Sequence, residues 1–185
     1  KKYFGVLSYQ EFNQTHSTNI FGIDALGNNE CDGFLSSECK AAFAIKTADC
    51  IPLLLWDESK SVMSGLHCGW KGLKNDIISK AIEGNSSHPF THAYIGPHIS
   101  KDYFEVKDDF IEAFRESNKD IEPFLDNFDG KNYMNLREYT VNELHQYGIE
   151  IINNFSPCSY LEKDHFFSWR RDNANPFRNL TIAWF

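Results

Sequence analysis

The sequence predicts an α+β fold, a single domain of mixed β-sheets layered with helices. Apolar runs of strand length alternate with segments whose apolar residues recur at helical spacing. No repeat, low-complexity tract or linker divides the chain. A length of 185 residues, 15% of them aromatic, suits one domain over residues 1–185 with a substantial core.

Short apolar runs predict the strands. They cover residues 43–45, 52–56, 62–66, 93–95, 150–155, 166–169 and 180–184. The polar residues 57–61 predict a turn, so the second and third strands are expected to pair as a hairpin. The fourth run stops at Gly96 and Pro97.

Apolar residues at helical spacing predict three helices, over residues 73–84, 108–117 and 135–147. Asn135 is a good residue to cap the third helix, and Gly148 follows its end. The segment between the second and third helices, through Gly130, is expected to be partly irregular.

Composition excludes several classes of protein. The formal charge of −8 argues against a nucleic-acid binder, which needs clustered Lys and Arg. No apolar stretch approaches the roughly 20 residues that span a bilayer, and no signal peptide is apparent. The odd count of 5 cysteines fits a reducing compartment. We therefore expect a cytoplasmic protein. The sequence leaves the oligomeric state open, with a monomer slightly favoured.

Three residues form a candidate metal or nucleophile site. In the predicted hairpin, Cys50 enters the first strand at the edge where His67 leaves the second, and His16 is a third candidate upstream. Catalytic zinc keeps three protein ligands and an open position. The separations of 34 and 17 residues follow no local spacing rule. The residues alone leave open a buried cysteine and two hydrogen-bonded histidines.

Two motifs carry a family resemblance: Thr-Ala-Asp-Cys-Ile-Pro at 47–52 and His-Cys-Gly-Trp-Lys-Gly at 67–72. The chain resembles the YfiH-like or laccase-domain family. This family is also called the multicopper polyphenol oxidoreductase family, and its members are regarded as zinc-dependent purine nucleoside phosphorylases. Further matches follow in order at residues 14–16, 31–33, 96–99, 103–106, 157–159 and 166–172. The resemblance implies that His16, Cys50 and His67 bind Zn²⁺, and that mixed sheets are covered by helices.

One departure from the family concerns the beginning of the chain. Only 15 residues precede His16, and the arginine- and glycine-rich signature of the family is not found in them. The resemblance therefore implies a domain that is shortened at its N-terminus.

Three basic residues are candidates for binding substrate. Lys71 lies in a glycine-containing turn before a predicted helix, where backbone N–H groups favour an anion such as phosphate; a solvated lysine is the alternative. Arg170 and Arg171 follow an aromatic run, and on a strand only one of them faces inward. Arg170 is expected to contact substrate phosphate or ribose as a catalytic residue, with Arg171 as second choice. Pairing of an arginine with Asp172 is the alternative.

Other polar residues have two interpretations each. Glu105 is a candidate general acid/base or ribose-hydroxyl acceptor, or else a carboxylate that stabilises the fold. Asp49 can orient a ligand or cap a turn, and His98 can be a fourth ligand or a loop histidine. Cys158 can line the site or be buried. Burial without chemistry is expected for Cys31, Cys39 and Cys68.

The leading functional hypothesis is a zinc enzyme of purine nucleosides. The resemblance implies that it acts on adenosine, inosine, guanosine or methylthioadenosine, by phosphorolysis with phosphate or by deamination. The second is a copper phenol oxidase, with Met63 as an axial donor, although 7 scattered histidines are few for a multicopper enzyme. The third is metal-free: a cysteine hydrolase with Cys50 as nucleophile and His67 as base, or an inactive homologue.

Overall fold

A mixed six-stranded sheet forms the middle of the molecule, with strand order β11-β7-β5-β6-β3-β2. The computed structural model describes residues 8–22, 30–37, 41–59, 61–173 and 175–184. The strands of this sheet are β2 (Ile20–Gly22), β3 (Gly33–Ser36), β5 (Ile51–Trp56), β6 (Met63–Cys68), β7 (His92–Ile95) and β11 (Glu150–Ile151). β5 is antiparallel to both β6 and β7, so the hairpin predicted from the sequence lies at the centre of the sheet.

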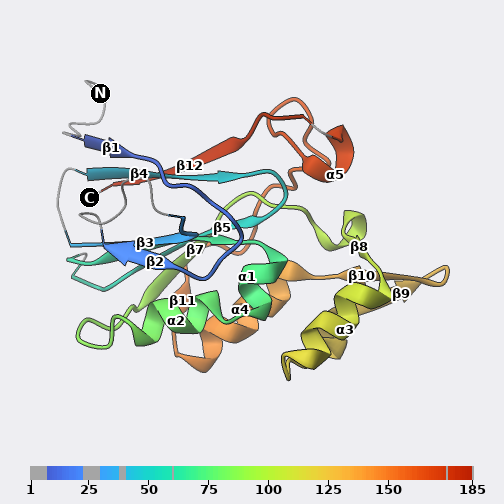
Figure 1. The fold of residues 1–185 in the computed structure, drawn as a ribbon, viewed down its shortest axis with the longest axis horizontal. Coiled ribbons are helices and arrows are strands. Elements are labelled where there is room, and N and C mark those ends of the chain that lie inside the picture. The colour runs from blue at the N-terminus through green and yellow to red at the C-terminus, as the bar shows by residue number, and fades with distance from the viewer. Residues whose placement is uncertain (1–7, 23–29, 38–40, 60, 174, 185) are drawn as a thin grey trace.

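A smaller sheet covers one face of the middle sheet (Figure 1). It consists of β1 (Ser8–Gln10), β4 (Ala41–Thr47) and β12 (Asn179–Trp184), in the order β1-β4-β12. Phe34 from β3 and Phe43 from β4 stack between the two sheets, with ring centroids 3.9 Å apart, and both are fully buried. This apolar cluster fixes the distance between the sheets.

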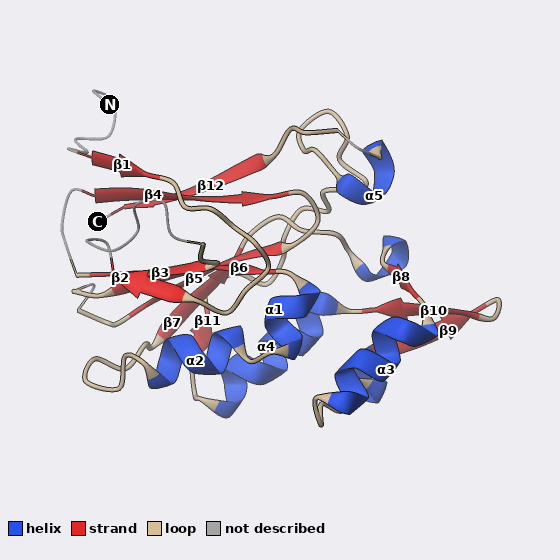
Figure 2. Ribbon diagram, viewed as in Figure 1, coloured by secondary structure: helices blue, strands red, loops and turns tan. Residues whose placement is uncertain are grey.

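Helices cover the opposite face (Figure 2). They are α1 (Trp70–Lys74), α2 (Ile77–Glu83) and α4 (Leu136–Gln146). The larger core lies here, where Leu53 and Leu66 of the sheet pack with Leu73, Ile77 and Leu144 of the helices, all of them fully buried. The result is a three-layer arrangement of small sheet, large sheet and helices.

A third sheet projects from one end of the helical layer (Figures 1 and 2). It contains β8 (Glu105–Val106), β10 (Lys131–Met134) and β9 (Leu125–Phe128), in the order β8-β10-β9. α3 (Asp108–Glu116) and the 3-10 turns η2 (Lys101–Tyr103) and η3 (Glu122–Phe124) complete this unit, and α5 (Trp169–Asp172) precedes β12. None of the helices in the described part of the chain has the length and apolar character that a membrane span requires.

The predicted fold class is confirmed, as are most of the predicted elements. The runs at 43–45, 52–56, 62–66, 93–95 and 180–184 overlap β4, β5, β6, β7 and β12. Helices α3 and α4 occupy their predicted ranges, and the Asn135 side chain caps α4 by accepting a hydrogen bond from the Glu138 N–H at 3.1 Å.

Other predictions were wrong for local reasons. The helix expected over 73–84 is two helices, because Asp76 adopts a left-handed backbone with φ 67° between them. The run at 166–169 is not a strand; it leads into α5, whose first turn the Ser168 side chain caps. The run at 150–155 forms only the two-residue β11. The segment expected to be irregular forms the β9–β10 hairpin, and β1, β2, β3 and β8 were not predicted.

Close packing between the two larger sheets generates a stability prediction. A Cβ added at Gly65 of β6 would lie 2.6 Å from the Phe34 ring atom Cζ and 3.0 Å from Ile45 Cδ1. We expect Gly65→Ala to lower the free energy of unfolding by about 1–3 kcal/mol, because both neighbours belong to packed cores. Urea denaturation measures this change. Gly22→Ala is the control, since nothing lies within 4 Å of a Cβ there; equal stability of the two variants would contradict the prediction.

Candidate metal centre

The structure brings together His16, Cys50 and His67, whose donor atoms all lie within 4.8 Å of one another. The hairpin places two of them: Pro52 of β5 is paired with His67 of β6, so Cys50 lies just beyond the last pair at the same sheet end. The His16 Nε2 is 4.0 Å from the Cys50 Sγ. The His16 and His67 ring centroids are 4.8 Å apart.

The carboxylate of Asp32 holds this arrangement. It is fully buried and accepts hydrogen bonds from the backbone N–H groups of Thr15, His16 and Ser17 at 3.1, 3.0 and 2.6 Å. It also accepts the Ser17 hydroxyl at 2.8 Å and the His67 Nδ1 at 2.7 Å. These bonds keep His16 in the left-handed region at φ 61° and leave the His67 Nε2 available to a metal.

Sequence analysis did not single out Asp32 as a site residue, although it lies in the matched stretch 31–33. The sequence does hold one indication of its role: Asp32 lies between a cysteine and a glycine in a short apolar segment, where a carboxylate is expected to be buried. A buried carboxylate requires several donors. Its donors lie 15 to 17 and 35 residues away, so no local pattern identifies them.

Cys50, His67 and Asp32 affect one another's ionisation. Burial raises the pKa of the Cys50 thiol, but contacts with His16 and His67 outweigh this and lower it to about 6. Burial lowers the pKa of His67, but the Asp32 hydrogen bond and then Cys50 raise it to about 9. Burial raises the pKa of Asp32, while hydrogen bonds from His67 and Ser17 bring it below its usual value. Cys50 is therefore a thiolate at neutral pH, the form that binds metals.

Gly69 leaves room beside the three donors. A Cβ at this position would lie 2.8 Å from the His16 Cδ2 and 3.1 Å from the Cys50 Sγ. The donor set of two imidazoles and one thiolate, with a carboxylate on the distal nitrogen of His67, suits zinc or copper rather than a hard cation. These residues therefore fit a bound transition metal.

A cavity of about 680 Å³ opens in front of the three donors. Three cations on its wall each lie over an aromatic ring: Lys71 over Trp70 at 5.7 Å, Arg170 over Phe104 at 5.3 Å and Arg178 over Trp169 at 5.5 Å. Such a wall combines flat apolar surface with positive charge. Lys71 and Arg170 are residues that the sequence indicated, whereas Arg178 and the three aromatic residues were not singled out.

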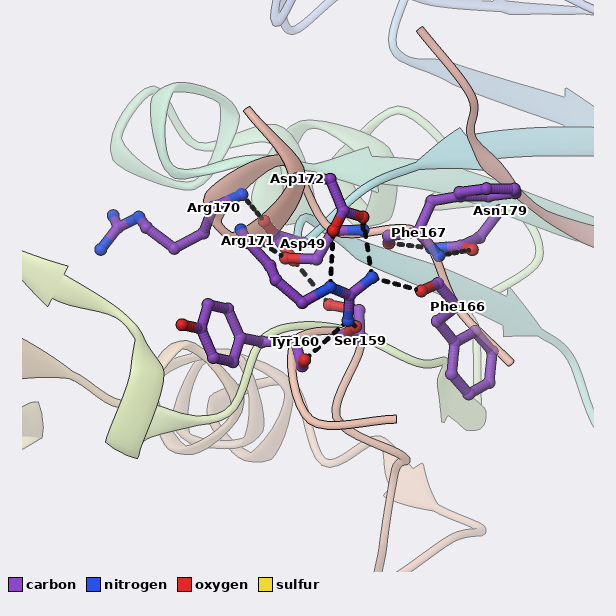
Figure 3. A network of polar contacts seen from close by, with 10 residues as sticks. Asp49, Ser159, Tyr160, Phe166, Phe167, Arg170, Arg171, Asp172 and Asn179 are labelled. Atoms are coloured by element: carbon purple, nitrogen blue, oxygen red, sulfur yellow. Dashed lines mark hydrogen bonds and ion pairs between the residues drawn. The ribbon is translucent and has the colours of Figure 1, made fainter. Parts of the chain in front are cut away.

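Asp49 connects the metal-binding hairpin to the opposite wall of the cavity (Figure 3). Its backbone is left-handed at φ 87°, and its carboxylate accepts the Ser159 hydroxyl and the Arg170 N–H, both at 2.7 Å. Its carbonyl accepts the Ile99 N–H at 3.0 Å. Asp49 therefore joins Cys50 to the segments that carry Ile99 and Arg170, both of which line the cavity.

Arg170 and Arg171 have different surroundings. The Arg170 guanidinium donates to the Glu105 carbonyl at 2.9 Å and remains on the cavity wall. The Arg171 guanidinium donates to both oxygens of Asp172 and to the carbonyls of Ser159, Tyr160 and Phe166 (Figure 3). It does not line the cavity, so the structure supports the pairing with Asp172 that the sequence left as an alternative.

The Glu105 carboxylate also lies outside the cavity lining. It forms an ion pair with Lys131 at 2.9 Å across the third sheet. Its contact with the site is through the backbone carbonyl that accepts from Arg170. The geometry corresponds to the alternative interpretation of Glu105, a residue that stabilises the fold.

The remaining candidates take no part in the donor set. His98 is buried, and its Nδ1 donates to the Gly96 carbonyl at 2.8 Å. The Cys158 Sγ is buried and accepts the Ser100 N–H and hydroxyl at 3.3 and 3.1 Å. Met63 begins the strand that His67 nearly ends, and it packs between the sheets, so it is not an axial donor. Cys31 and Cys68 are fully buried, as expected, and Cys39 lies outside the described residues.

The three-layer fold carries a site like that of a metalloprotein. Nitrogen and sulfur donors face a cavity lined by cations and aromatic rings. The family model described as multi-copper polyphenol oxidoreductase laccase matches residues 4–185, and the chain belongs to this family. A solved structure of a Neisseria meningitidis DUF152 protein is 30% identical with a TM-score of 0.83, covering 96% of this chain and 75% of that chain. The Bacillus licheniformis protein YfiH has the same fold, at 24% identity and a TM-score of 0.81, over 94% of this chain and 73% of its own.

Similar curated proteins are named as enzymes of purine nucleosides. A purine nucleoside phosphorylase of Haemophilus influenzae is 30% identical over 93% of this chain and 72% of its own length. One of Clostridium acetobutylicum is 31% identical over 98% of this chain and 79% of its own. An adenosine deaminase from an unknown prokaryotic organism is 29% identical over 91% of this chain and 71% of its own.

The role of Asp32 can be tested by its effect on metal affinity. We expect Asp32→Asn to weaken binding of Zn²⁺ by about 10–100-fold, because the His67 ring and the His16 loop lose their charged acceptor. Competition with a chromophoric chelator measures the affinity. Asp57→Asn is a matched control, since Asp57 is a buried carboxylate that accepts from Ser61 and Val62 at the far end of the same hairpin. Equal affinities in the two variants would contradict this role.

The ionisation of Cys50 gives a second prediction. In chelator-treated protein, we expect the rate of Cys50 alkylation to reach half its maximum near pH 6. The rate should decrease further at lower pH, because protonation removes the nucleophilic thiolate. An ordinary thiol would instead titrate near 9.0. The rate is followed by mass spectrometry, and Cys50→Ser identifies the signal of this residue. A midpoint at pH 8 or above would show that the imidazoles do not stabilise the thiolate.

Proposed function

We propose that this protein is a zinc-dependent enzyme of purine nucleosides, acting by phosphorolysis or by deamination of adenosine. The observation that carries the proposal is the convergence of two imidazoles and a thiolate within 4.8 Å, facing a cavity lined by cations and aromatic rings. The relatives named purine nucleoside phosphorylase and adenosine deaminase support the substrate class.

His16, Cys50 and His67 would hold the metal in this proposal. When bound, Zn²⁺ supplies a Lewis acid at the floor of the cavity, the chemistry on which zinc deaminases of nucleobases depend. Zinc fits this site better than a copper oxidase centre does, because Met63 packs between the sheets and is not one of the donors. Within the described residues, no other group of three His, Cys, Asp or Glu could hold a further ion.

Aromatic side chains provide surfaces for a purine ring. Trp70, Phe104 and Trp169 line the cavity from α1, the loop before β8 and α5. Their rings give the cavity aromatic surface against which a base can pack, and stacking of a base on an aromatic ring is worth about 1–3 kcal/mol. The cavity volume of about 680 Å³ is within the range of small-molecule sites.

Lys71 and Arg170 are the proposed phosphate ligands. Both line the cavity, and no ion pair within the described residues uses either of them. In phosphorolysis, a phosphate oxygen bonds to the ribose C1′ while the C1′–N9 bond breaks, giving ribose 1-phosphate and the free base. Asp49 would fix Arg170 for this step through the Arg170 N–H. Glu105 and Arg171 act as positioning residues and make no contact with substrate.

Product analysis tests the proposal. We expect zinc-loaded protein to convert adenosine to adenine when phosphate is present, or to inosine by deamination without it, with chromatography as the readout. Removal of zinc by a chelator should abolish turnover, since the proposed Lewis acid is lost.

We also expect Arg170→Ala to raise the KM for phosphate about tenfold or more, because a charge-assisted contact is removed.

A matched control is Arg115→Ala, because Arg115 lies on α3, away from the cavity, and pairs with Glu122. Absence of adenine, hypoxanthine and inosine under every condition would overturn the proposed activity. Turnover that persists after zinc removal but is lost in Cys50→Ser would instead indicate the cysteine hydrolase.

A further inference from the structure

The cavity carries more positive charge than one phosphate requires. Its lining contains four cations, Lys46, Lys71, Arg170 and Arg178, and a single carboxylate, that of Asp49. Lys46 pairs with Glu11 at 3.3 Å, and the two oxygens of Asp49 already accept from Ser159 and Arg170. Within the described residues, no ion pair compensates Lys71, Arg170 or Arg178. The excess is local, because the whole chain has a formal charge of −8.

These cations come from two sides of the metal-binding hairpin. Lys71 lies in the first turn of α1 in the helical layer, and Arg170 reaches the Glu105 carbonyl at β8. Arg178 and Lys46 belong to the small-sheet layer: Asn179 of β12 is paired with Thr47 of β4, and Leu180 with Lys46. Arg178 therefore stands beside the end of β4, near Ala48. Cys50 and His67 belong to the large sheet between these two layers (Figure 1).

Among the residues that the structure describes, no carboxylate holds Arg178 in place. Its Nη1 donates to the carbonyls of Asn175 and Phe177 at 3.0 and 2.8 Å, and its guanidinium lies over the Trp169 ring. Backbone carbonyls orient the guanidinium but leave its full charge uncompensated. Arginine in such a setting suits a phosphate monoester, which carries about −1.5 to −2 charge and three acceptor oxygens.

We infer that Arg178, assisted by Lys46, forms a second anion subsite that receives the 5′-phosphate of a purine nucleotide. The inference rests on the proposed function for the purine and for the phosphate at Lys71 and Arg170. A 5′-phosphate is attached at the opposite end of the ribose from the C1′ bond that phosphorolysis breaks. In the proposed complex, the 5′-phosphate of one ligand lies at Arg178 and Lys46 on the small-sheet side. The glycosidic bond of the same ligand faces Lys71 and Arg170.

Binding of inosine 5′-monophosphate and inosine to the zinc-loaded protein tests this subsite. Inosine has no 6-amino group and cannot be phosphorolysed in phosphate-free buffer, so calorimetry reports binding without turnover. We expect the nucleotide to bind about tenfold or more tightly than the nucleoside. Arg178→Ala should reduce that ratio to about twofold or less, while Arg178→Lys should keep part of it. Arg115→Ala is the control and should keep the whole preference.

Two results would overturn the subsite. They are equal affinities of nucleotide and nucleoside in the native protein, and an equal loss of both affinities in Arg178→Ala. A nucleotide preference that depends on Arg178 would stand even if adenosine were not turned over, so this inference and the proposed activity fail separately.

Discussion

The Asp32 carboxylate is the constraint on which the candidate site depends. A fully buried charge is costly unless its oxygens are hydrogen-bonded, and this one gathers three consecutive backbone N–H groups, a hydroxyl and an imidazole. Satisfying the carboxylate forces the loop at residues 15–17 to wrap around it. That wrapping turns His16 toward Cys50, and the same carboxylate fixes the tautomer of His67. The need to solvate one buried charge thus creates the metal-binding geometry.

A second carboxylate, that of Asp49, organises the cavity wall in the same way, through hydrogen bonds to distant segments. Asp49 is next to Cys50 in sequence, yet its oxygens bind groups 110 and 121 residues away. Arg171 then ties the neighbouring segments to one another through carbonyls and Asp172. The cations that face the cavity are therefore carried by a framework whose own charged groups are hydrogen-bonded. An acidic chain can in this way keep a positive pocket, which concentrates anions locally.

The sequence predicts those parts of the fold and of the site that depend on local residue patterns. The apolar runs on either side of residues 57–61 revealed the central hairpin, and the hairpin alone put Cys50 and His67 at one sheet end. The predictions are wrong where contacts between residues far apart in the sequence determine the local structure. Residues 166–169 resemble a buried strand, but Ser168 caps a short helix there and Arg171 finds its partners in other loops. Asp32 was missed for the same reason, since its donors lie 15 to 17 and 35 residues away. Arg178 and the aromatic residues were missed because the cavity that they line is assembled from segments far apart in the chain.

The wide spacing of the donors also determines when the site can exist. His16, Cys50 and His67 are 34 and 17 residues apart, and each is oriented by tertiary contacts, so an unfolded chain presents no chelate. Small zinc modules, by contrast, use closely spaced ligands and fold around their ion. Here the layered scaffold must assemble first, so a metal at this site would bind to the folded molecule. An ion bound at that stage stabilises the native state by mass action without directing how the polypeptide folds.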